Sequence, residues 1–292
     1  MTSTGYEVLR NEKTFMVRGG SPARFLGAFG ASYWRSWVFP LYTPAGQTVV
    51  REFPFEHPWH NGVFVAQNPV RVGSREGNFW ALPLPRQADD HLMAHMGRMD
   101  PRHEPEAEVT ADGVRFTLNS TWRDEQEEPL IDELRTVSLR ALPDATVCDM
   151  MSRKTAAYGA AEFGRKKFGS IGMRVEPRLL PPLGGQVLAG RDGRLERGAA
   201  DEVANARACD AVAYEADVAG VGVFGVCMMI LDNSASEDRR GPWFIRDYGQ
   251  ATFNATQDAS IHVAEGDTWT IALRVVAYDG PLTVARIGAW QS

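Results

Sequence analysis

The chain has 292 residues, of which 44% are hydrophobic and 23% charged, with 28 glycines and 17 prolines. These values are typical of a globular protein with many turns, and they exclude long disordered stretches. The net charge of −6 provides no positive field for phosphodiester backbones, so nucleic acid is not an expected partner.

Short segments rich in β-branched and aromatic residues recur between clusters of Gly, Pro, Asn and Asp, a pattern typical of strands joined by turns. In chain order they cover residues 6–8, 15–17, 47–53, 63–65, 114–118, 134–139, 146–151, 172–175, 221–231, 259–263 and 268–278. In segment 114–118 the apolar residues occupy every second position, as a strand with one buried face requires. The sequence therefore predicts an all-β protein in which sheet packs on sheet.

The segments between the strands contain few helix signals. Residues 199–208 carry good helix formers but could equally form a surface loop, and residues 86–105 are predicted to be a long irregular connection. No Gly/Ser or Pro-rich linker divides the chain. We expect one domain over residues 1–292, a large β-sandwich with few short helices.

Two observations bear on the compartment. The segment MTSTGYEVLRNEKTF lacks the charged head and apolar run of a secretion signal. The longest nearly apolar run, residues 219–231, is too short to cross a bilayer. We expect a cytoplasmic protein without a membrane partner.

The densest group of candidate functional residues is the segment EHPWHNG, residues 56–62. His57 and His60 are three positions apart in a proline-braced turn, so their imidazoles can converge on one point above a sheet. Imidazole titrates near neutral pH and can take a proton from carbon or oxygen and return it. The pair could instead cap turns through hydrogen bonds or bind a metal.

A metal site would need further ligands. His91 and His95 are four positions apart and would share one face of a helix, so together with His57 and His60 they could form a nitrogen-rich site. A solvated loop is the competing interpretation of this segment. The sequence requires no cofactor, and a divalent metal remains an alternative.

Two later segments offer further candidates. Residues 241–249, GPWFIRDYG, combine an aromatic ring, a cation, a carboxylate and a phenol that could bind a polyhydroxylated ring, although Trp243 could equally fill the core. In residues 162–174, Lys167 or Arg174 could stabilise a developing oxyanion, or form a basic turn facing solvent. The sequence contains no GxSxG elbow and no phosphate-binding glycine loop, whereas paired carboxylates for glycoside cleavage stay open.

Several motifs in one order resemble the soluble bacterial family labelled PmoA-like. They are PLYTPAGQTVVREFPFEHPWHNGVFVAQ, NFW at residues 78–80, KFGSIGMRV, GPWFIRDYG and LRVVAYDGPL, and together they cover about residues 39–290. The resemblance implies a β-sandwich, similar to the galactose mutarotase type, in proteins linked with sugar metabolism. Membrane methane oxygenases need transmembrane helices, and this sequence contains no segment that predicts one. The methane oxidation that the label suggests is therefore not expected.

The family's DHPHHRG core is matched only in part. His57 and His60 agree with it, whereas Glu56 stands in place of an aspartate, Trp59 in place of a histidine and Asn61 in place of an arginine. A role that needs three imidazoles is therefore not expected from this segment.

We expect an enzyme that acts on a sugar or keto-sugar derivative by histidine acid/base chemistry, as a lyase, an epimerase or a glycoside-cleaving enzyme. His57 or His60 would transfer the proton, and Lys167 or Arg174 would stabilise negative charge. The residues expected to bind the ring are Glu56, Trp59, Asn61, Trp80, Trp243, Arg246, Asp247 and Tyr248. The alternatives are a non-catalytic carbohydrate-binding module and a metal-dependent oxygenase, and homo-oligomerisation stays open.

Overall fold

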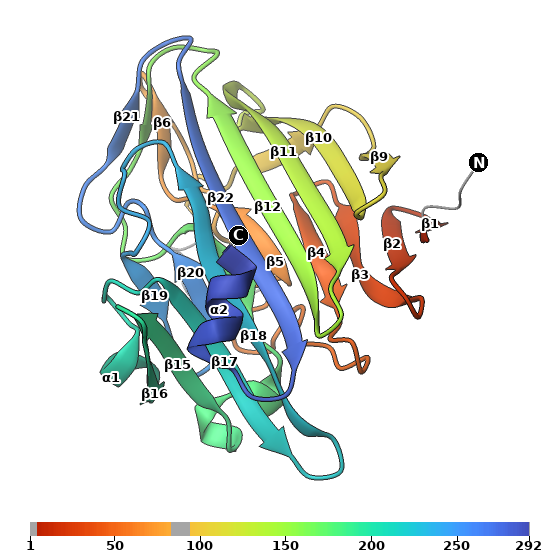
Figure 1. The fold of residues 1–292 in the computed structure, drawn as a ribbon. Helices are drawn as coiled ribbons and strands as arrows, with labels where there is room; N and C mark the ends of the chain where they lie inside the picture. Colours follow the sequence, from red (N-terminus) through yellow and green to blue (C-terminus); the bar gives the residue numbers. More distant parts are fainter. Residues whose placement is uncertain (1–4, 83–93, 292) are drawn as a thin grey trace.

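The computed structural model describes residues 5–82 and 94–291, and within them the chain is built mainly from antiparallel sheets (Figure 1). The predicted all-β class is confirmed. The eight-stranded sheet runs in the order β1 (Tyr6–Asn11), β2 (Thr14–Gly19), β3 (Arg24–Ala31), β4 (Ser36–Leu41), β5 (Val63–Ala66), β14 (Ser170–Arg174), β20 (Gln250–Phe253) and β19 (Trp243–Ile245).

A second, larger sheet faces the first. Its order is β16 (Arg194–Gly198), β15 (Gln186–Arg191), β17 (Ala211–Val218), β18 (Gly222–Asn233), β22 (Thr268–Asp279), β12 (Ala145–Thr155), β11 (Pro129–Ala141), β10 (Val114–Arg123) and β8 (Arg98–Pro101), with β9 (Glu106–Val109) paired to β10. A four-stranded sheet lies at one end of the sandwich (Figure 1) and runs β21 (Ile261–Val263), β13 (Ala161–Phe163), β6 (Val70–Val72) and β7 (Arg75–Gly77).

The helices of the described residues are short. They are α1 (Ala200–Val203), α2 (Val284–Gln291) and the 3₁₀ turns η2 (Pro177–Leu179) and η3 (Pro181–Leu183). Helix α2 covers the outer face of the larger sheet (Figure 1), where the ring of Trp290 lies 5.3 Å from that of Tyr278. No helix in the described ranges is long and apolar enough to span a membrane.

One hydrophobic cluster fills the space between the two large sheets. Phe29 of β3 and Phe116 of β10 meet across it with ring centroids 5.5 Å apart, and Phe15 of β2 packs 6.0 Å from Phe116. Such buried aromatic rings contribute strongly to folding, because each removes a large apolar area from water. This packing leaves the opposite face of the eight-stranded sheet free to carry polar side chains.

Most predicted strands are present, but three expectations need correction. Residues 47–53 form only isolated bridges, at Thr48, Val50 and Glu52, and not a strand. The helix signal of residues 199–208 corresponds only to α1. The segment 86–105, predicted to be irregular, contains β8, and its residues 86–93 lie outside the described ranges.

Candidate functional site

The candidate site lies on the face of the eight-stranded sheet that points away from the larger sheet. Side chains alternate along a strand. In β5, Val63 and Val65 belong to the core between the sheets, so Phe64 points to the opposite face. In β14, Met173 belongs to the core, and Arg174 therefore points to the same outer face as Phe64.

The segment before β5 places both histidines above this face. The N–H of His57 donates to the carbonyl of Pro54 at 3.0 Å, and the N–H of His60 donates to the carbonyl of His57 at 3.0 Å. Gly62 then has a φ of 54°, and a Cβ there would lie 2.0 Å from the carbonyl oxygen of Val38. Only glycine fits this approach, which returns the chain to β5 directly after the turns.

Four roughly parallel rings form a column that contains both imidazoles. The ring of His57 stacks on Tyr248 with centroids 5.0 Å apart at 5°, and on His60 at 5.0 Å and 3°. His60 stacks in turn on Phe64 at 6.1 Å, and the edge of Trp80 approaches it at 5.4 Å. The two imidazoles that the sequence predicted to converge are therefore adjacent and enclosed by aromatic rings.

A buried arginine joins the column to a carboxylate. The side chain of Arg174 is 0% exposed, its Nη1 donates to Nδ1 of His60 at 3.1 Å, and its Nη2 donates to Oε1 of Glu56. Its guanidinium also lies 4.9 Å from the ring centroid of Tyr248. We call Glu56, His57, His60, Arg174 and Tyr248 the histidine cluster. Since a guanidinium can only donate, Nδ1 of His60 accepts, and the neutral ring carries its proton on Nε2.

The charges in the histidine cluster follow from burial and from Arg174. Burial lowers the pKa of His60 well below 6.5, and the charge of Arg174 lowers it further. Burial and Arg174 also lower the pKa of His57, against the opposing effect of Glu56. Burial raises the pKa of Glu56, but its own backbone hydrogen bond and the charge of Arg174 outweigh this, so the net direction is downward. At neutral pH the site holds two neutral imidazoles beside an ionised Glu56–Arg174 pair.

Buried polar atoms without a hydrogen-bond partner are concentrated on this face. Nine of the 14 such side-chain atoms in the described residues belong to His57, Trp59, His60, Asn61, Arg174, Gln250 and Thr252. The register places Gln250 opposite Arg174 and Thr252 opposite Gly172. An unsatisfied buried polar group costs about 1–3 kcal/mol, so these atoms need hydrogen bonds from ordered water or from a polar ligand.

Arg35, in the turn between β3 and β4, holds the aromatic cover of the cluster in place. It is 1% exposed, and it donates to the carbonyls of Trp59 and, at 3.3 Å, of Trp80. Its guanidinium lies 5.3 Å from the ring centroid of Phe64. Burial, reinforced by the charge of Arg135, lowers the pKa of Arg35 to about 9. No sequence motif identifies Arg35 as part of the site. Gln250 and Thr252 are identified as neighbours of the cluster only by their strand register with β14.

Three other predicted binding residues are not brought into the cluster. Trp243 is 0% exposed in the core, and its indole N–H donates to backbone carbonyls. The carboxylate of Asp247 accepts the N–H of Ala200 at 2.8 Å, and Arg246 pairs with Asp201 at 2.9 Å. Of the predicted segment 241–249, Tyr248 is the residue that contacts the histidines.

The remaining predicted site residues are likewise outside the cluster or outside the described ranges. Lys167 is exposed in the loop between β13 and β14. His95 is exposed and lies 3.5 Å from the carboxylate of Glu125. His91 lies outside the described residues. Within residues 5–82 and 94–291, no group of three or more His, Cys, Asp and Glu side chains is placed to hold a metal ion.

Comparisons with known proteins give a family but no activity. A crystal structure described as a galactose mutarotase related enzyme from Lactobacillus acidophilus aligns with 95% of this chain and 100% of its own, at 11% identity and a TM-score of 0.32, which carries no functional conclusion. No curated protein matches the sequence. The sequence does match one family description over residues 14–291, and the chain therefore belongs to the family of unknown function DUF6807.

Proposed function

We propose that the histidine cluster is the active site of an enzyme that acts on a sugar or keto-sugar by histidine acid/base chemistry. The observation that carries the proposal is the stacked pair of neutral imidazoles beside a fully buried guanidinium. A neutral imidazole can accept a proton, and a guanidinium can stabilise the negative charge that the loss of this proton creates.

His57 is the group best suited to accept the proton. It is half-buried, whereas His60 is 2% exposed and already accepts a hydrogen bond from Arg174. A carbonyl acidifies the neighbouring C–H of a keto-sugar. When that bond breaks, its electron pair moves to the carbonyl oxygen to form an enolate, and the proton goes to the imidazole of His57.

The guanidinium of Arg174 is the donor for the enolate oxygen. The Nε2–H of His60 has no protein partner and points away from the Nδ1 that accepts from Arg174, so it would donate to a different oxygen of the substrate. A preorganised donor to the enolate oxygen contributes about 3–4 kcal/mol to the transition state. Protonation of the carbon from the opposite face by water, with the proton of His57 released to solvent, would give an epimer, and departure of a leaving group with its electron pair from the next carbon would give a lyase product.

The surrounding side chains suit a polyhydroxylated ligand. Asn61 and Gln250 each have a buried, unpartnered amide N–H₂ and carbonyl oxygen, and Thr252 has a buried, unpartnered hydroxyl. Amides and hydroxyls can both donate to and accept from sugar hydroxyls. A ligand would approach from the side of Glu56, whose side chain is 45% exposed, and of the half-buried Tyr248.

The test is solvent exchange at carbon. Keto-sugars and glycosides are incubated with the protein in D₂O, and ¹H NMR follows loss of the C–H signal next to the carbonyl as well as new products. We expect exchange or product with the unchanged protein, and neither with His57→Ala at retained secondary structure. His262→Ala removes an exposed histidine of β21 and serves as the matched control. Saturable sugar binding with neither exchange nor product would overturn the enzyme proposal in favour of a binding module.

A further inference from the structure

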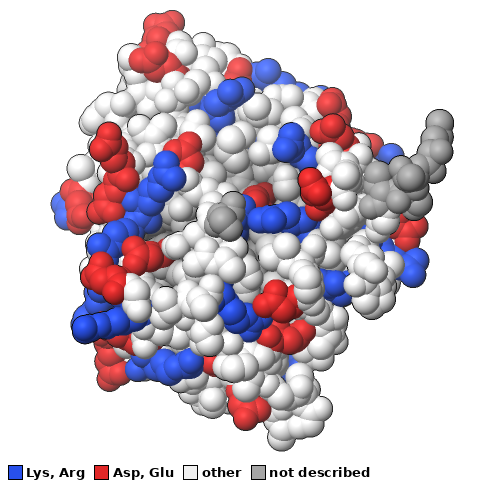
Figure 2. All heavy atoms as spheres, viewed as in Figure 1, with Lys and Arg blue, Asp and Glu red and all other residues white. Residues whose placement is uncertain are grey.

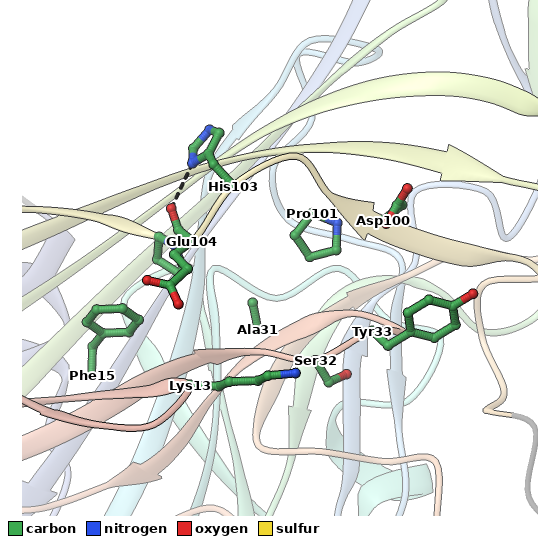
Figure 3. Close-up of a pocket in the computed structure, with 10 residues that line it drawn as sticks. Lys13, Phe15, Ala31, Ser32, Tyr33, Asp100, Pro101, His103 and Glu104 are labelled. Carbon is green, nitrogen blue, oxygen red and sulfur yellow. Dashed lines mark hydrogen bonds between the residues drawn. The ribbon is translucent and has the colours of Figure 1, made fainter.

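A concave region separate from the histidine cluster is formed by two cavities that share Lys13, Ala31, Ser32 and Tyr33. One cavity, of about 380 Å³, is lined by these residues and by Thr14, Gly30, Trp37, Phe39 and Glu52. The other, of about 280 Å³, lies towards β8 and is shown in Figure 3. We call the two together the Lys13 groove.

The Lys13 groove lies one strand away from the histidine cluster. Trp37 of β4 lines it and is the register partner of Phe64 of β5, whose ring stacks on His60 at 6.1 Å. Neighbouring strands are about 4.8 Å apart, and directly opposed side chains share one face. Trp37 is therefore the nearest aromatic side chain of the groove to the ring column of the cluster.

The wall of the groove on this side is aromatic and fixed. The indole N–H of Trp37 donates to Glu52, which holds the ring in orientation. Tyr33, at the other end, is 52% exposed, although the guanidinium of Arg98 lies 4.3 Å from its ring centroid. An exposed aromatic ring such as that of Tyr33 can stack on the apolar C–H face of a sugar. The carboxyl group of Glu52 adds an oxygen that can hydrogen bond to a hydroxyl.

Lys13 supplies the positive charge of the groove, and burial raises the pKa of the neighbouring Glu52 carboxyl group, whose hydrogen-bond partner is the indole of Trp37. The side chain of Lys13 extends towards Ser32 and away from the carboxylate of Glu104 (Figure 3). Glu104 pairs instead with Arg10 at 2.7 Å, and Asp100 is neutralised by its own arginine partners. In the part of the chain that the structure describes, no carboxylate pairs with Lys13. On the face seen in Figure 2, by contrast, basic and acidic side chains are interspersed.

We propose that the Lys13 groove binds a second sugar ring that carries a carboxylate, adjacent to the ring held at the histidine cluster. Tyr33 and Trp37 would stack on this ring, and the ammonium of Lys13 would pair with its carboxylate. The inference rests on the proposed function and extends it, because it assigns the substrate to acidic oligosaccharides or uronate-containing glycosides.

The test is calorimetric titration of the full chain with glucuronate and with glucose. We expect glucuronate to bind more tightly than glucose. Lys13→Met should weaken glucuronate binding by about three- to fivefold, as for an exposed ion pair, without changing glucose binding. Tyr33→Ala should weaken the binding of both sugars by roughly three- to tenfold. Arg115→Met removes an exposed charge of β10 that does not line the groove, and should leave both affinities unchanged.

His57→Ala separates this inference from the proposed function. Glucuronate binding that persists in His57→Ala and weakens in Lys13→Met supports the groove, whatever the exchange assay shows. Glucuronate binding that is lost in His57→Ala but unchanged in Lys13→Met and Tyr33→Ala overturns the groove and leaves the proposed active site standing. Absence of saturable glucuronate binding to the unchanged protein also overturns the groove.

Discussion

Acidification should destabilise the protein through His60, and the size of this effect can be worked out. The folded-state pKa of His60 lies well below 6.5, because the ring is buried and faces Arg174, whereas the unfolded chain takes up the proton near 6.5. The unfolded state therefore binds more protons below pH 6.5, and stability falls as pH falls. At pH 5.5 this single group costs about 1.4 kcal/mol relative to pH 7.5.

Urea denaturation at half-unit steps from pH 7.5 to 5.5 measures this effect. His60→Gln keeps an acceptor for Arg174 but does not titrate, so its free energy of unfolding should fall by about 1.4 kcal/mol less than that of the unchanged protein over this range. His262→Gln, which replaces an exposed histidine, should keep the original pH dependence. Equal slopes for His60→Gln and the unchanged protein would refute the burial argument.

Three further substitutions test the electrostatics and the backbone. Arg174→Met should raise the pKa of both imidazoles of the cluster, measured by NMR titration, because it removes a positive charge that lowers them; unchanged values would contradict the assignment. Burial lowers the pKa of Lys154 to about 7, so stability should rise with pH between 7 and 10.5, and Lys154→Met should remove this rise. Lys154→Met should also be about 1–3 kcal/mol more stable than the unchanged protein at pH 7, because Glu133 keeps Arg135, Ser152 and Trp122 as partners. A loss of stability in Lys154→Met would contradict this expectation. Gly62→Ala should cost about 2–4 kcal/mol in urea denaturation, from strain at positive φ and a contact of 2.0 Å, whereas Gly46→Ala, also at positive φ but with open space, should cost less.

Strand positions could be predicted where apolar residues alternate. Where a strand also buries charged residues, the predicted strand was shorter than the observed one. Segment 134–139 is part of β11, which extends over Pro129–Ala141. Within β11, Glu133 and Arg135 face the core and are 3% and 1% exposed. Their side chains form an ion pair at 2.6 Å. A sequence pattern assigns charged residues to the surface. Only the cross-strand neighbours in the fold explain their burial.

The incorrect strand at residues 47–53 has a backbone cause. Phe53 takes a φ of 44°, and Pro54 follows it, so the chain leaves the extended conformation just before the histidine turns. Conversely, β3 and β17 are rich in Gly and Ala and lack the β-branched runs that mark strands. Their sheet neighbours, rather than local propensity, determine that they are extended.

The histidine pair could be predicted because residue type and spacing alone identify it. Its partners could not be separated from their neighbours in the same way. Strand β19 ends at Ile245, and the turn that follows directs Arg246 and Asp247 towards α1 while Tyr248 returns to His57. The direction of each side chain in a turn depends on backbone angles that the sequence does not display.

The proposed chemistry requires that the two imidazoles are neutral at pH 7 and that His60 accepts from Arg174 at Nδ1 and carries its proton on Nε2. ¹⁵N NMR of histidine-labelled protein reports both the charge and the tautomer of each ring. We predict two neutral rings at pH 7, with the proton of His60 on Nε2 and its Nδ1 accepting a hydrogen bond. An imidazolium at either position, or a proton on Nδ1 of His60, would contradict it.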